Sequence, residues 1–86
     1  MKKDQRRQYF AIIAGILELA VGGTIKTKIM YAVNLSYAQL GKYISLLIKL
    51  KFLEESTRGR RTIYKTTEKG VDFLKRYEEL KRLLIQ

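Results

Sequence analysis

The stretch SYAQLGKYISLLIKLKFLEESTRGRRTIYKTTEKG, residues 36–70, contains the signals that decide the fold. Ser36 can accept a hydrogen bond from the Gln39 amide while the Gln39 side chain reaches back, which is the capping box that starts a helix. Two runs typical of β-strands then flank residues 57–61 (TRGRR), in which glycine supplies the turn. Residues 67–70 (TEKG) follow, and Thr67 can cap another helix. The stretch therefore predicts a helix, a β-hairpin and the beginning of a second helix.

The residues before this stretch predict two further helices. Apolar residues recur with helical spacing over residues 4–22. A short helix is expected over residues 25–33, with Thr24 as its N-terminal cap. Asn34 tolerates the left-handed conformation that ends helices, so the connection to the helix at residues 36–51 can be tight. Two helices joined in this way form the pattern of a helix-turn-helix.

The helix at residues 36–51 is the candidate recognition helix because its two faces differ. One face is small and basic, so it can approach the major groove of DNA closely and donate hydrogen bonds there. An ordinary solvated surface explains this helix equally well when it is considered alone. The buried stripe is expected to contain Leu40, Tyr43, Ile44, Leu47 and Leu50. The candidate DNA contacts are Ser36, Tyr37, Ala38, Gln39, Lys42, Ser45 and Lys49.

Three arginines lie at the predicted tip of the hairpin, which spans residues 52–66. A solubilising loop needs charge but not three arginines in four positions, so contacts with DNA phosphates or the minor groove explain them better. Together with the helices, this hairpin predicts a winged helix-turn-helix, mainly α-helical with a two-stranded β-hairpin wing. Outside the recognition helix, the basic candidates for DNA contact are Lys26, Lys28, Arg58, Arg60 and Arg61.

A last helix is expected over residues 67–85, and it has two apolar borders. Along one border the apolar residues recur at steps of four, three and four, which is the spacing of a coiled-coil seam. We expect one border to pack on the domain and the other to meet a second copy of the chain, although both could fold back onto the domain. The candidate dimer-interface residues are Phe73, Tyr77, Leu80 and Leu84.

Composition limits the classes of function. The 86 residues include 18 Lys and Arg against 8 Asp and Glu, and the resulting formal charge of +10 favours an anionic partner. Cysteine and histidine are absent, so a thiolate metal site and the commonest general base are both missing. The sequence therefore predicts no enzyme, no metal site and no cofactor, and no small-molecule ligand is evident from it.

Length and linker content predict a single domain over residues 1–86, since no proline-rich or low-complexity segment divides the chain. The apolar segment from Tyr9 to Ala20 is interrupted by Glu18 and is shorter than the ~20 residues that a spanning helix needs. We therefore expect no membrane association, and a cytoplasmic, nucleoid-associated protein.

Several blocks of sequence occur together in this chain: residues 25–31 (IKTKIMY), residues 35–39 (LSYAQ), Tyr43 with Leu47, Phe52-Leu53, and Tyr64 with residues 67–70. In combination they resemble the small archaeal winged helix-turn-helix proteins that dimerise through a C-terminal helix, including copies in archaeal viruses and plasmids. The resemblance extends over about residues 9–84. It implies binding of double-stranded DNA, with the helix from Tyr37 as recognition helix and residues 58–61 as wing.

Two features depart from the family pattern. Lys51 stands where the family commonly has glycine before the strand that follows the recognition helix. The C-terminal helix is also shorter than the long coiled coil of the chromatin-type members. The shorter helix favours a compact dimer that acts as a local regulator over one that bridges DNA duplexes.

The sequence as a whole predicts a dimeric transcription regulator that binds double-stranded DNA. The recognition helix would read the major groove while the wing contacts phosphate or the minor groove. Three alternatives remain at this point: a sequence-nonspecific protein that packages the nucleoid, an RNA-binding module, and a membrane-surface or interaction protein that uses the apolar face of its first helix.

Overall fold

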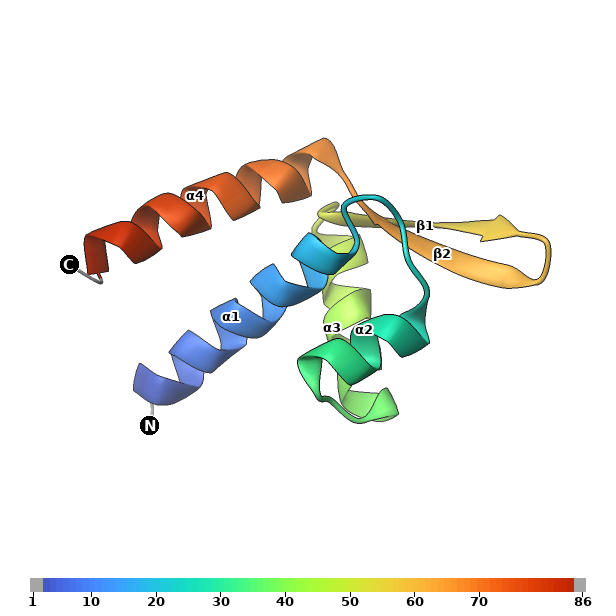
Figure 1. Ribbon diagram of the computed structural model, residues 1–86, viewed down its shortest axis with the longest axis horizontal. Coiled ribbons are helices and arrows are strands. Elements are labelled where there is room, and N and C mark those ends of the chain that lie inside the picture. Colours follow the sequence, from blue (N-terminus) through green and yellow to red (C-terminus); the bar gives the residue numbers. More distant parts are fainter. Residues whose placement is uncertain (1–2, 85–86) are drawn as a thin grey trace.

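The computed structural model describes residues 3–84, with side chains from residue 8 onward. The elements follow in the order α1 (Lys3–Leu19), α2 (Lys26–Val33), α3 (Tyr37–Lys49), β1 (Leu53–Arg58), β2 (Arg61–Thr66) and α4 (Glu68–Leu84). Figure 1 shows α1, α2 and α3 grouped together, with the hairpin extending away from this group and α4 running beside α1. The predicted fold class is confirmed: a mainly helical winged helix-turn-helix with a two-stranded antiparallel wing. Residue 85, the expected end of the last helix, lies outside the described residues.

The hydrophobic core lies where the first three helices meet the base of the wing. Each helix contributes side chains from one face, because residues three or four apart in a helix lie on the same side. Thr66 is buried with them, and its hydroxyl donates a hydrogen bond of 2.6 Å to the Leu17 carbonyl. The largest fully buried side chains are Ile16, Leu17, Ile29, Leu40, Leu47 and Leu53.

The connection between α1 and α2 is tied to the wing. The backbone of Thr24 pairs with that of Tyr64 in β2 through N···O distances of 2.9 and 2.8 Å, and the Ala20 carbonyl accepts from the Thr66 amide at 2.8 Å. Because these bonds hold the chain against β2, α1 ends at Leu19 and does not reach the expected residue 22. The prediction that Thr24 caps α2 is also wrong, since the N-cap is Ile25 and makes no side-chain capping bond.

The turn between α2 and α3 confirms two local predictions. Asn34 takes the left-handed conformation, with φ 58° and ψ 49°, and its amide donates to the Met30 carbonyl. The capping box then starts α3: the Gln39 amide donates to the Ser36 hydroxyl at 3.1 Å, and the Ser36 amide donates to Gln39 Oε1 at 3.0 Å. Together these bonds fix the angle between the two helices of the helix-turn-helix.

Two hydrogen bonds characteristic of a Schellman motif end α3 at Lys49, before the expected residue 51. The Lys51 amide donates to the Ile48 carbonyl at 3.0 Å and the Phe52 amide donates to the Leu47 carbonyl at 2.9 Å. Lys51 itself has a φ of 68°, the conformation for which glycine is usual.

The side chain of Thr67 connects the end of α3 to the start of α4. Its hydroxyl donates to the Lys51 carbonyl at 2.6 Å and accepts from the Gly70 amide at 3.1 Å. Gly70 packs so closely here that a Cβ atom would collide with the Phe52 carbonyl oxygen and lie 2.6 Å from Thr66 Cγ2. The junction is therefore closely fitted on both sides of the threonine.

Residues 53–58 and 61–66 pair in antiparallel register, from Leu53 opposite Thr66 to Arg58 opposite Arg61. The strands extend further than the sequence indicates, so the expected loop at residues 57–61 shortens to two residues. Gly59 is the first of these two and has a φ of 61°, a conformation that glycine adopts at little steric cost. The tight turn confines the arginines to the very end of the wing.

Candidate nucleic-acid interface

The residues of α3 predicted to contact DNA are all exposed. The small and basic residues of this helix lie on the side opposite Leu40, Ile44 and Leu47, which are buried in the core. Leu50 was expected in the buried stripe but is 40% exposed, because the helix ends there and the chain turns at Lys51. The exposed candidates are Ser36, Tyr37, Ala38, Gln39, Lys42, Ser45 and Lys49.

The capping box limits what two of these residues can offer to a ligand. The Ser36 oxygen accepts from a backbone amide, which leaves its hydroxyl hydrogen to donate. The carbonyl oxygen of the Gln39 side chain accepts from the Ser36 amide, which leaves the amide nitrogen of Gln39 to donate. Both side chains therefore present donors, which suit phosphate oxygens and base acceptors.

The two lysines of α2 have different environments. Lys28 is exposed, whereas Lys26 is half-buried. The Lys26 ammonium lies 4.0 Å from the centre of the Tyr37 ring, so it makes a cation–π contact with the first residue of α3. The sequence placed both lysines among the candidates for DNA contact, but it did not indicate that Lys26 packs on α3.

Tyrosines surround the start of α3. Tyr37 is 64% exposed, and Tyr31 on α2 is 79% exposed although it was not among the predicted contacts. The sequence signal for Tyr31 was its position two residues from buried Ile29, on the opposite side of α2.

Tyr64 lies at the base of the wing. Burial raises the pKa of the Tyr64 hydroxyl, and the neighbouring Glu55 and Tyr37 raise it further, so Tyr64 stays neutral.

The wing brings its arginines together at the tip. Arg58, Arg60 and Arg61 are all exposed. Arg58 and Arg61 are register partners, so their side chains leave the same face of the hairpin directly opposite one another. Like charges in this arrangement destabilise a hairpin. Across the described residues, the two ion pairs both lie within α4, so neither of them neutralises these arginines.

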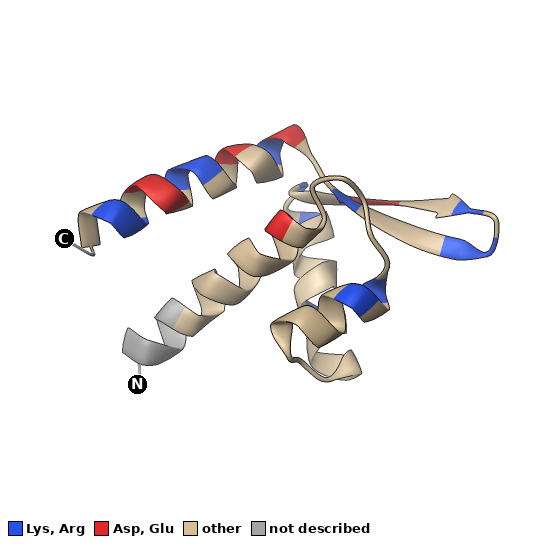
Figure 2. Cartoon of the chain, in the orientation of Figure 1, with Lys and Arg blue, Asp and Glu red and all other residues tan. Residues whose placement is uncertain are grey.

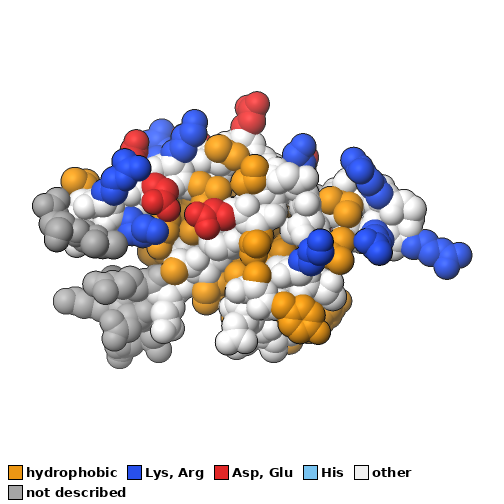
Figure 3. Space-filling view, viewed as in Figure 1, with side chains coloured by type: hydrophobic (Ala, Val, Ile, Leu, Met, Phe, Trp, Pro, Cys, Tyr) orange, Lys and Arg blue, Asp and Glu red, His pale blue; other side chains and the backbone are white. Residues whose placement is uncertain are grey.

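Positive charge is concentrated on the part of the molecule that carries α2, α3 and the wing (Figure 2). Residues 24–67 contain nine Lys and Arg, against Glu54 and Glu55 as their only acidic residues. On α4, by contrast, basic and acidic residues alternate, and Asp72 pairs with Arg76 at 2.9 Å. Figure 3 shows the same contrast on one face of the surface, with only basic charge at the tip of the wing.

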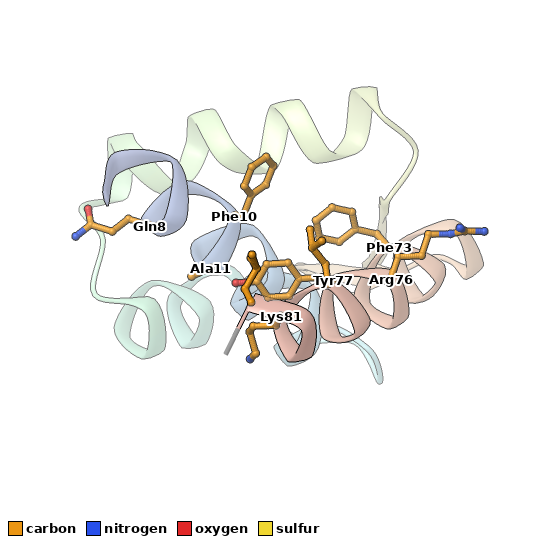
Figure 4. Close-up of a pocket in the computed structure, with 9 residues that line it drawn as sticks. Gln8, Phe10, Ala11, Phe73, Arg76, Tyr77 and Lys81 are labelled. Atoms are coloured by element: carbon orange, nitrogen blue, oxygen red, sulfur yellow. The ribbon is translucent and has the colours of Figure 1, made fainter. Parts of the chain in front are cut away.

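The predicted dimer residues line an apolar groove between α1 and α4 (Figure 4). Its volume is about 600 Å³, and Phe10 and Ala11 of α1 form the wall that faces α4. Phe73 and Tyr77 stack at 6.1 Å between ring centres, while Leu80 and Leu84 are 55% and 74% exposed. The four seam residues therefore share one surface, and residues of α1 complete it.

No group of three or more metal-ligating side chains occurs within the part of the chain that the structure describes. None of the described helices has the length and apolar character needed to cross a membrane.

The chain matches the model of the winged helix-turn-helix family over residues 6–84, and it belongs to that family. Among solved structures it is similar to Sso10a-2, a DNA-binding protein from Sulfolobus solfataricus, with a TM-score of 0.74 and 29% identity over 84% of this chain and 76% of that one. An uncharacterized protein of Methanocaldococcus jannaschii is 39% identical over 59 residues, which cover 63% of this chain. The match spans 61% of that relative's length. The resemblance to archaeal winged helix-turn-helix proteins is thereby confirmed.

Proposed function

We propose that this protein binds double-stranded DNA and acts as a homodimeric transcription regulator. The observation that carries the proposal is the wing, where Arg58 and Arg61 lie directly opposite each other at an exposed tip. Two opposed guanidinium groups destabilise an isolated hairpin, but they match the phosphates of a duplex, which attract arginine and release counterions on binding. The similarity to a DNA-binding protein from Sulfolobus solfataricus supports the same partner.

In this proposal α3 enters the major groove. Ala38 leaves the backbone free to approach the bases, while Lys42 and Ser45 supply donors for base edges. Lys28, Lys49 and the wing arginines contribute phosphate contacts, which supply most of the affinity. The protein acts by binding and not by catalysis, and its proposed location is the nucleoid in the cytoplasm.

The α1–α4 groove supports dimerisation through a second copy of the chain. Leu80 and Leu84 expose apolar surface at the end of α4 that their own domain leaves uncovered. Burying a leucine side chain stabilises an interface by roughly 1.5 to 3 kcal/mol, so a second α4 seated on this groove would gain from each copy. A two-fold pair would also present two copies of α3, which suits a palindromic DNA site.

Sequencing the fragments that the purified protein selects from random duplexes tests the regulatory role. A defined palindromic site is expected for a dimeric regulator, whereas enrichment without any sequence preference would instead indicate a packaging protein. Competition between duplex DNA and single-stranded RNA at fixed salt tests the class of nucleic acid. Preferential displacement by RNA would contradict the proposal.

A further inference from the structure

Lys26 and Tyr37 form a contact that joins the two helices of the helix-turn-helix. The Lys26 ammonium lies 4.0 Å from the centre of the Tyr37 ring. It also lies beside Gly41, one helical turn further along α3, at 3.6 Å from the position that a Cβ atom would occupy there. The ammonium therefore lies along the surface of α3, over its first turn and beside Gly41, which is half-buried.

This contact distinguishes Lys26 from a simple phosphate ligand. Lys28, two residues further along α2, is exposed and free to reach a DNA backbone, whereas Lys26 is half-buried against α3. A cation placed over an aromatic ring restricts the orientations of both groups. The Lys26 side chain thus stabilises one position of the Tyr37 ring.

Tyr37 is well placed to bind a ligand with its ring held in that one orientation. It is the first residue of α3, its side chain is 64% exposed, and the capping box fixes the backbone immediately before it. A phenol hydroxyl is a good donor to a charged oxygen. A ring that is already oriented loses less conformational freedom when such a bond forms.

We propose that Lys26 is a positioning residue that holds the Tyr37 ring at the start of α3, so that the Tyr37 hydroxyl donates a hydrogen bond to a DNA phosphate. The inference rests on the proposed function, because it names one contact of the same interface. It assigns different roles to two neighbouring lysines: Lys28 neutralises a phosphate, and Lys26 acts through Tyr37.

The salt dependence of duplex binding separates these roles. Lys28→Met is the matched control, and it should lower the slope of log K against log salt by about 0.9, the value for one lost phosphate contact. Lys26→Met should weaken binding several-fold with the slope unchanged. Tyr37→Phe should weaken binding about tenfold, also with the slope unchanged, because a neutral hydroxyl releases no counterion.

The double variant tests whether Lys26 acts through the hydroxyl. Once Tyr37→Phe has removed the donor, adding Lys26→Met should cause little further loss. Lys26→Arg should retain binding close to that of the unmodified chain, since arginine also stacks on an aromatic ring. In the free protein, the ring current should shift the NMR signals of the Lys26 ε-methylene group, and Tyr37→Leu should abolish that shift.

Three results would overturn the inference: a drop in slope for Lys26→Met equal to that of Lys28→Met, multiplicative losses in the double variant, or ε-methylene signals that Tyr37→Leu leaves in place. Each can occur while the unmodified protein binds duplex DNA, so each leaves the proposed function intact. Absence of duplex binding by the unmodified protein would overturn both together.

Discussion

Lys51 adopts a left-handed backbone conformation in which glycine is the usual residue. Its φ of 68° is required because the chain must reverse direction between α3 and β1, and the two hydrogen bonds of the Schellman motif form only in that geometry. The left-handed conformation costs a residue with a Cβ atom roughly 1 to 2 kcal/mol. The family resemblance identified this position from sequence, because glycine is common there.

Replacing Lys51 by glycine should stabilise the protein. Glycine relieves the backbone strain but loses more conformational entropy on folding, so we expect a net gain of roughly 0.5 to 1 kcal/mol in the free energy of unfolding. Urea denaturation followed by circular dichroism measures it. Lys42→Gly is the control in the middle of α3 and should destabilise by about 1 kcal/mol. Equal destabilisation by both substitutions would contradict the account of Lys51.

At the scale of the elements, local signals were sufficient where the partner groups are close in sequence. Ser36 and Gln39 are three residues apart, and Asn34 acts on its own helix, so both were predictable. The end of α1 and the cap of α2 were not, because Thr24 pairs with Tyr64 far along the chain. The contact of Lys26 with Tyr37 likewise depends on how α2 docks on α3.

Removing two arginines from the wing should have opposite effects on the stability of the protein and on its binding to DNA. Replacing Arg58 and Arg61 by alanine removes repulsion between opposed charges, so the free protein should be as stable as before or slightly more stable. Binding to all duplexes should weaken similarly, and the salt slope should fall by about 0.9 for each lost contact. Fluorescence anisotropy across a salt series measures this slope.

Lys65→Ala is the matched control for the wing, because Lys65 is exposed on β2 opposite Glu54. It should leave the slope nearly unchanged. A double arginine variant that keeps the original slope would show that the wing does not contact phosphate.

The exposed face of α3 is tested by Ser45→Glu. A carboxylate on this face would oppose phosphates and base acceptors, so duplex binding should be lost. The melting temperature should stay nearly unchanged, since Ser45 is exposed. Ser45→Ala controls for loss of the hydroxyl alone and should retain most binding. Normal binding by the glutamate variant would place α3 outside the groove.

The molecule as a whole separates two kinds of surface. The basic wing and the apolar end of α4 extend from the core in different directions, within overall dimensions of 46 × 26 × 20 Å (Figure 1). Periodicity along α4 was sufficient to predict which of its residues line one surface. It could not predict that Phe10 and Ala11 complete that surface, because this depends on how α1 packs beside α4.

The assembly is tested by Leu80→Asp combined with Leu84→Asp. If α4 forms the contact between copies, the charged pair should convert a dimer to monomer in light scattering, since each buried leucine contributes roughly 1.5 to 3 kcal/mol. Affinity should fall by orders of magnitude on a duplex with two half-sites and little on a single half-site. Lys75→Asp, at an exposed polar position of α4, is the control. A monomeric unmodified protein at high micromolar concentration would contradict this prediction.

If two copies pair through α4 as proposed, Thr67 at the junction of α3 and α4 sets how rigidly the two copies of α3 are spaced. The Thr67 hydroxyl donates to the Lys51 carbonyl, just past the end of α3, and accepts from the Gly70 amide in the first turn of α4. A single residue therefore ties the two helices together. In a pair joined through α4, the two copies of α3 would thus be held at a fixed distance and orientation, with no flexible linker between them. One added base pair rotates a half-site by about a tenth of a turn, so inserting it between half-sites should weaken binding about as much as deleting one half-site.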